Sequence, residues 1–69
     1  MKVYGICIGD YVNECNFMFC EARNKTEARS AGMRYKRAWK IREPILKIVE
    51  IPESIGNDNN ARRKYAVAA

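Results

Sequence analysis

Residues 17–51 read FMFCEARNKTEARSAGMRYKRAWKIREPILKIVEI, and this stretch decides the fold. Its opening alternation of aromatic and smaller apolar side chains predicts a strand over residues 16–22. Asn24 then starts a helix, because its side chain can accept a hydrogen bond from the amide of Glu27. The helix is expected to run to about residue 39 or 40, because Pro44 forces the residue before it out of the helical region.

Two further strands complete the pattern. Residues 45–51 are rich in Ile, Leu and Val, and residues 2–8 are rich in residues that favour strands. Turn-forming residues join 2–8 to 16–22 as an antiparallel hairpin, with Tyr11 and Val12 as an extension of the first strand. The sequence therefore predicts an α+β fold of order β-β-α-β, with one helix packed on a three-stranded sheet. The first strand is expected in the centre, and the crossover through the helix is expected to be right-handed.

The chain of 69 residues is long enough for one domain. We expect residues 1–52 to form it and residues 53–69 to be a polar linker and C-terminal tail, rich in Asn. Within this tail, residues 60–69 either form a short helix or stay mobile. The second face of the sheet would then be covered only by the tail or by a partner, and one pair of neighbouring side chains would lie open there: Phe17 and Phe19, or Met18 and Cys20.

The net charge is +5, but its distribution is uneven. Residues 23–47 hold nine Lys and Arg against two Glu, so this segment alone carries +7. At about 100° per residue, the cations of the helix gather on one side and its apolar residues on another. The basic face consists of Lys25, Arg29, Lys36, Arg37 and Lys40. The apolar face consists of Ala28, Ala31, Gly32, Tyr35, Ala38 and Trp39.

Two readings are open for the aromatic residues at the end of this helix. Trp39 and Tyr35 are residue types on which nucleic-acid bases stack. They fall on the apolar face with Ala28, however, which favours packing in the core. Phe17 and Phe19 also suit base stacking from a sheet, but the basic-glycine-aromatic signature of the common RNA-binding sheet is absent from the sequence.

The composition argues against catalysis and against a bound metal or cofactor. The chain contains no histidine, the commonest general base, and no phosphate-binding glycine loop. Its three cysteines, Cys7, Cys15 and Cys20, are spaced by eight and five residues and do not form a zinc motif. We interpret them as reduced, small apolar residues. With no apolar run long enough for a membrane span or a signal peptide, a cytoplasmic protein is expected.

The segment of residues 17–51 resembles short phage-encoded proteins in which a strand ending in Ala runs into a capped helix carrying Glu-Ala-Arg. The matching residues here are Ala22, Asn24, Glu27, Ala28 and Arg29. Phage proteins of this size are often accessory or host-takeover factors, including anti-CRISPR proteins, that obstruct host machinery by contact. The resemblance implies a role of that kind and carries over no catalytic residue.

The sequence thus predicts a non-enzymatic binding protein that inhibits a host protein or nucleoprotein complex through its basic helix face. Clustered Lys and Arg supply charge-assisted hydrogen bonds and steer association with negative surfaces. The alternative is a small basic regulator that binds DNA or RNA directly. A homo-oligomer joined through an open sheet face or edge is a third hypothesis.

Overall fold

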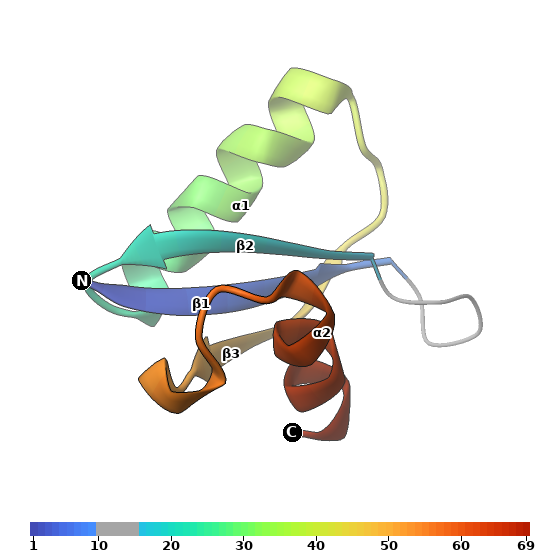
Figure 1. Cartoon of the computed structure of the whole chain (residues 1–69). Coiled ribbons are helices and arrows are strands. Elements are labelled where there is room, and N and C mark those ends of the chain that lie inside the picture. Colours follow the sequence, from blue (N-terminus) through green and yellow to red (C-terminus); the bar gives the residue numbers. More distant parts are fainter. Residues whose placement is uncertain (10–15) are drawn as a thin grey trace.

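The computed structural model describes residues 1–9 and 16–69. The elements in chain order are β1 (Lys2–Ile8), β2 (Asn16–Ala22), α1 (Lys25–Trp39), β3 (Ile45–Ile51), a short 3-10 turn (Glu53–Ile55) and α2 (Asn59–Ala68). Figure 1 shows the sheet with α1 behind it and α2 in front of it. The expected hairpin turn, the extension of the first strand at Tyr11 and Val12, and Cys15 lie outside the described residues.

The α+β prediction is confirmed, including the place of the first strand. The sheet has the order β2-β1-β3, and β1 is antiparallel to both neighbours. Ile6 faces Met18 across one pairing and Ile48 across the other, so three apolar side chains line up across the sheet. The register with β3 shifts by one residue between Cys7 and Ile8. Because successive side chains of a strand point to opposite faces, a slip by one residue would turn Ile6 and Ile48 away from the face that α1 covers.

The main core lies between the sheet and the first half of α1. Its buried members are Tyr4, Ile6, Ile8, Ala22, Ala28 and Ile48. The helix can come this close because Gly32 has no side chain. A Cβ atom at that position would lie 3.1 Å from Cδ1 of Ile45 and 3.2 Å from Cγ2 of Ile6. Asn24 caps the helix as the sequence predicts, since its Oδ1 accepts a hydrogen bond from the Glu27 amide at 2.9 Å.

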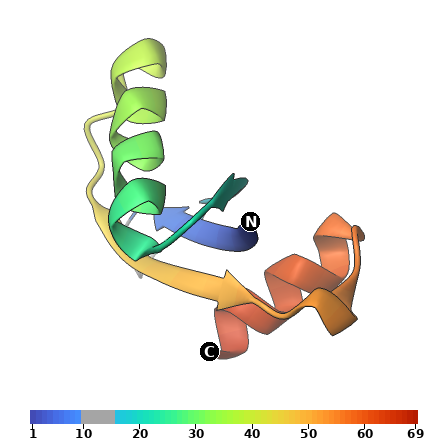
Figure 2. The same cartoon turned by 90° about the vertical axis from the view of Figure 1, so that its left-hand side faces the viewer.

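The second half of α1 extends past the sheet. The buried residues of this helix are Ala28 and Gly32, both in its first eight positions. Figures 1 and 2 show the helix rising away from the strands beyond the edge formed by β2. The expectation that Tyr35, Ala38 and Trp39 pack in the core is therefore wrong, because all three are exposed. They do share the angular side of Ala28, but at their level no strand lies beneath the helix.

Helix α2 covers the opposite face of the sheet, over β3 and β1 (Figure 2). Of the two alternatives for residues 60–69, the structure has the helix. Ala66 is fully buried against the sheet, and Gly5 lies directly opposite it. A Cβ atom at Gly5 would be 3.5 Å from that of Ala66 and 3.1 Å from the ring of Phe19. Small residues thus set the approach of both helices, one on each face.

Polar contacts fix α2 at both of its ends. The Nε atom of Arg62 donates to the Gly56 carbonyl at 3.0 Å, and its NH2 group donates to Oδ1 of Asn57 at 3.1 Å. At the other end, Nζ of Lys47 donates to the carbonyl of Ala69 at 3.0 Å. A cation at this position also complements the negative end of the helix dipole. These bonds hold the C-terminal helix on the sheet although few of its residues are buried.

Candidate functional site

The basic face predicted from the sequence lies on the outside of α1. Lys25, Arg29, Arg37 and Lys40 are exposed and Lys36 is half-buried. Within residues 1–9 and 16–69, the ion pair present joins Nζ of Lys2 to Glu50 at 2.9 Å, far along the chain from this helix. None of the five cations is therefore neutralised by a described carboxylate. Glu27, in the first turn, is the acidic residue of α1.

Lys40 occupies a backbone position that favours glycine. It ends α1 in the left-handed conformation, with φ 54° and ψ 42°. The amide of the next residue, Ile41, closes the helix by donating to the Lys36 carbonyl at 2.9 Å. A side chain in this conformation costs roughly 1–2 kcal/mol, which glycine avoids. The chain thus keeps a cation at the tip of the helix against the preference of its own backbone.

Two aromatic side chains lie beside these cations. Trp39 is 69% exposed and Tyr35 is 39% exposed, and their ring centroids are 6.2 Å apart with the planes tilted by 46°. Aromatic residues of this size are the ones most enriched at the centres of binding surfaces. Sequence reasoning placed them in the core because a helical wheel gives the angle of a residue but not the point where its helix leaves the sheet.

Strand β2 forms one edge of the sheet and is in contact with α1. On its inner side β2 pairs with β1, and no described strand pairs with its outer side. Its apolar residues Phe17, Met18, Phe19 and Cys20 are all half-buried. Met18 and Cys20 pack against the core under α1, whereas Phe17 and Phe19 lie on the α2 side with parallel rings 6.3 Å apart. The guanidinium of Arg62 lies 6.0 Å from the centre of the Phe19 ring, so α2 partly covers the face that the sequence left open.

The cysteines differ between the two faces of the sheet. Cys7, fully buried, is disulfide-bonded, so the interpretation of all three cysteines as reduced is wrong. An odd number of cysteines leaves room for one bonded pair. Cys20 is free and partly buried on the α1 side. Burial raises the pKa of its thiol, and the nearby positive charge of Arg34 opposes that shift. The described residues contain no cluster of ligands that would hold a metal ion.

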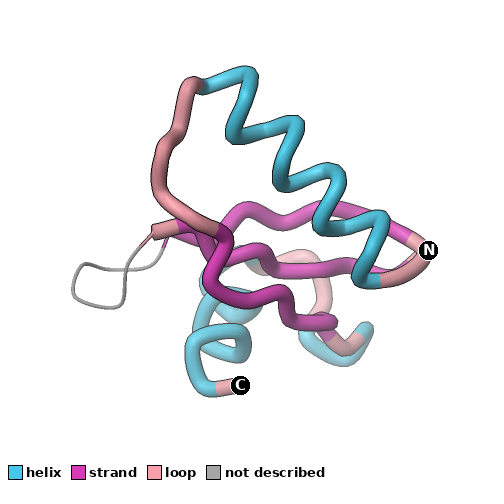
Figure 3. Tube along the Cα trace, turned by 180° about the vertical axis from the view of Figure 1, so that it is seen from behind, coloured by secondary structure: helices cyan, strands magenta, loops and turns pink. Residues whose placement is uncertain are grey.

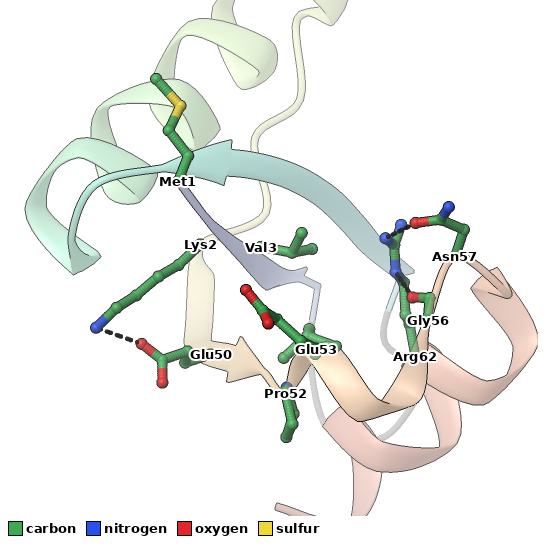
Figure 4. Close-up of a pocket in the computed structure, with 10 residues that line it drawn as sticks. Met1, Lys2, Val3, Glu50, Pro52, Glu53, Gly56, Asn57 and Arg62 are labelled. Atoms are coloured by element: carbon green, nitrogen blue, oxygen red, sulfur yellow. Dashed lines mark hydrogen bonds and ion pairs between the residues drawn. The ribbon is translucent and has the colours of Figure 1, made fainter.

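A hollow of about 350 Å³ lies where the first residues of β1 meet the end of β3 and the loop before α2 (Figure 4). Among its charged residues, Lys2 pairs with Glu50 and Arg62 is engaged by Gly56 and Asn57, whereas Glu53 lines the hollow without an ion pair to a described residue. These contacts hold the segments of the fold together. The hollow therefore has a structural explanation, and α1 remains the candidate functional surface.

Comparison of the chain with protein-family models, with curated proteins and with solved structures gave no match. Among the described residues, neither helix has the length and apolar character needed to cross a membrane. The functional argument consequently rests on the geometry and charge of this chain.

Proposed function

We propose that this protein is a non-enzymatic binding protein that contacts a negatively charged surface of a macromolecular partner through the basic face of α1. The observation that supports it is the exposure of Lys25, Arg29, Arg37 and Lys40, none paired with a described carboxylate. Such cations raise the rate of association with an acidic surface and form charge-assisted hydrogen bonds once bound. No described carboxylate lies within ion-pair distance of these cations.

The leading partner is a protein or nucleoprotein complex. The resemblance of residues 17–51 to phage accessory proteins supports an inhibitory role against a host or defence complex, achieved by contact alone. The exposed Trp39 and Tyr35 would add an apolar anchor next to the cations, which is the usual composition of a strong contact point. Disulfides such as the one at Cys7 are more frequent in oxidising compartments.

Direct binding of DNA or RNA is the second candidate, and one observation favours it. Trp39 and Tyr35 were expected in the core but lie exposed beside Lys36 and Lys40, as stacking residues do beside phosphate-binding cations. This function predicts an affinity for oligonucleotides that falls steeply as the salt concentration rises. Fluorescence anisotropy with single- and double-stranded probes at low salt tests it, and absence of binding excludes it.

The main test reverses charge on α1 and compares it with an equal reversal elsewhere. Arg29→Glu combined with Arg37→Glu changes two exposed cations of the basic face. Arg23→Glu combined with Lys64→Glu changes two exposed cations outside α1. Pull-down from host lysate, with and without nuclease, should show a partner that is lost with the first variant and kept with the second. Equal capture by both variants would contradict the assignment of the surface.

A further inference from the structure

The inference concerns α2 and the face of the sheet beneath it, so it is independent of the proposed function, which concerns α1. Figure 3, seen from behind, shows α2 and the loop before it on the side of the sheet opposite α1, in agreement with Figure 2. Tyr4 and Ile6 belong to the core under α1, whereas Gly5 between them faces α2. Phe17 and Phe19, with their parallel rings, lie on the α2 side as well. The sheet therefore has a second apolar face, which α2 covers.

The apolar attachment of α2 to this face is small. Ala66 is the buried residue of the helix, and Ala61 and Arg62 are half-buried. On the other face, the core under α1 contains six buried residues. Burial of apolar area supplies most of the free energy that holds one element on another. Less free energy is therefore needed to release α2 from the sheet than to release α1.

The polar contacts of α2 differ in what they join. The hydrogen bonds of Arg62 run to the loop that directly precedes the helix, so they can move with the helix and need not break when it leaves the sheet. The helix is linked to the sheet by the bond from Nζ of Lys47 to the Ala69 carbonyl and by the guanidinium of Arg62 beside the Phe19 ring. The Lys47 bond is exposed to water, which competes for the same groups and keeps its net contribution modest.

Gly56 supplies a hinge between the sheet and the helix. It ends the 3-10 turn with φ 76° and ψ −154°, a conformation that is essentially restricted to glycine. Because glycine has no side chain, its two backbone dihedrals can change without a steric clash, and such a change would swing α2 away while β3 stays in the sheet. Once off the sheet, a helix of ten residues is only marginally stable in water and unwinds.

We infer that α2 is a detachable cover, hinged at Gly56, which leaves the sheet as a unit while the sheet and α1 stay folded. Opening uncovers the face that holds Phe17 and Phe19, and closing returns Ala66 to its place against Gly5. A partner of this face would meet it only in the open molecules, so its affinity would be lowered in proportion to the fraction that is open. The cover thus controls access to the second face of the sheet, separately from the basic face of α1.

Hydrogen exchange of the full chain, measured for each amide by NMR spectroscopy at increasing urea concentrations, tests the inference. The amides of α2 should be at least about tenfold less protected than the slowest amides of β1. Their exchange should also depend less on urea, because the opening of α2 exposes less surface than global unfolding does. Equal protection and equal urea dependence of the two elements would show that only global unfolding releases α2, and would overturn the inference.

A variant in the core under α1 separates local from global opening. Ile48→Val removes one methyl group from that core and should speed the slowest exchange of β1 about fivefold. The exchange of α2 should stay unchanged, because the core under α1 is intact both when α2 is docked and when it is open, so the substitution destabilises both states equally. Acceleration of both elements by the same factor would contradict the cover.

A pair of lysine variants distinguishes detachment of α2 from fraying of a helix that stays docked. Lys47→Ala removes the bond from β3 to the Ala69 carbonyl and should speed exchange at the protected amides of α2 together, by about three- to fivefold. Lys64→Ala, at an exposed position of α2 itself, is the matched control and should change these rates by less than about twofold. Unchanged exchange of α2 in Lys47→Ala would mean that the helix unwinds in place, and the inference would fail. Equal acceleration by both variants would defeat it as well.

Discussion

Helices α1 and α2 lie on opposite faces of the same sheet, yet they use their polar residues in different ways. In α2, Arg62 is engaged by the loop before the helix, and the last carbonyl groups accept from Lys47. In α1, the cations on the basic face contact no described carboxylate. The charged residues at α2 hold this helix on the sheet, whereas four of the five cations of the basic face of α1 are exposed to solvent.

The aromatic residues differ in the same way. Phe19, beneath α2, contacts Arg62 and lies opposite Gly5 in the sheet. Trp39, at the end of α1, contacts only Tyr35 among the described rings. A domain this small has little apolar area to bury in its core. Leaving a Trp side chain exposed therefore forgoes a substantial part of the stabilisation that burial could supply. The contrast teaches that α2 completes the fold, whereas the second half of α1 leaves Tyr35 and Trp39 exposed.

The largest contrast expected between the two faces is chemical. In denaturant without reductant, iodoacetamide should modify Cys20 and leave Cys7 unmodified, because Cys7 is in a disulfide. After reduction with dithiothreitol both should be modified. Peptide mass spectrometry localises the label, and modification of Cys7 before reduction would show that the face under α2 has no such bond.

Overpacking under α1 should have the largest effect on stability. Gly32→Leu introduces a side chain where even a Cβ atom would approach Ile6 and Ile45 within 3.2 Å. We expect the free energy of unfolding in urea to fall by about 2 kcal/mol. Ser30→Leu, exposed on the same helix, is the matched control and should change it by less than about 0.5 kcal/mol. Similar values for both would mean that α1 is not packed at Gly32.

A smaller loss is expected when α2 is detached from its loop. Arg62→Ala removes hydrogen bonds to Gly56 and Asn57 as well as the contact with Phe19. The free energy of unfolding should fall by about 1 kcal/mol. Arg37→Ala on α1 should be nearly neutral, because it makes no such bonds. If the arginine of α1 proved the more important for stability, the division of roles between the helices would be reversed.

At the tip of α1 we expect stability to rise at the expense of binding. Lys40→Gly relieves the left-handed backbone at φ 54° and should raise the free energy of unfolding by about 0.5–1 kcal/mol. It also removes one cation of the basic face, so partner capture should weaken. Lys40→Ala separates the two effects, since it removes the charge and keeps the strain. A variant with glycine that is stabilised and binds fully would exclude Lys40 from the site.

The smallest expected effect depends on pH. Because burial raises the pKa of Cys20 above the ordinary 9.0, the folded protein keeps this proton at a pH where the unfolded chain has lost it. The unfolded state then binds fewer protons, so stability decreases as the pH rises past 9.0 and is unaffected below it. In Cys20→Ala, the part of the fall in the free energy of unfolding that the Cys20 thiol causes should be absent. Urea denaturation of both proteins at pH 8 and pH 10 measures it.

Much of the fold could be predicted because it depends on local chemistry. The three strands, the Asn24 cap and the helix end before Pro44 follow from strand propensity, capping and the geometry of proline. The cap is a contact between residues three apart, so sequence proximity alone determines it. The five cations of α1 were likewise assigned to one surface from helical periodicity.

The candidate site depended on features that sequence reasoning missed. It assigned Tyr35 and Trp39 to the core and gave residues 60–69 the choice of a helix or a mobile tail. It also interpreted Cys7 as reduced. Each error concerns a contact between segments distant in the chain. For Trp39, the signal that was available is the length of α1, since a helix of 15 residues spans about 22 Å and overruns a sheet of three strands.

By itself, the sequence determined the order of the elements, the central place of β1 and a positive surface on α1, because propensity, capping and periodicity act over a few residues. Only the tertiary structure decided where α1 leaves the sheet and which face α2 covers. Those outcomes depend on how closely Gly32 and Gly5 let the helices approach and on the angle at which α1 crosses the strands. Packing between distant segments sets that angle, and no local pattern encodes it.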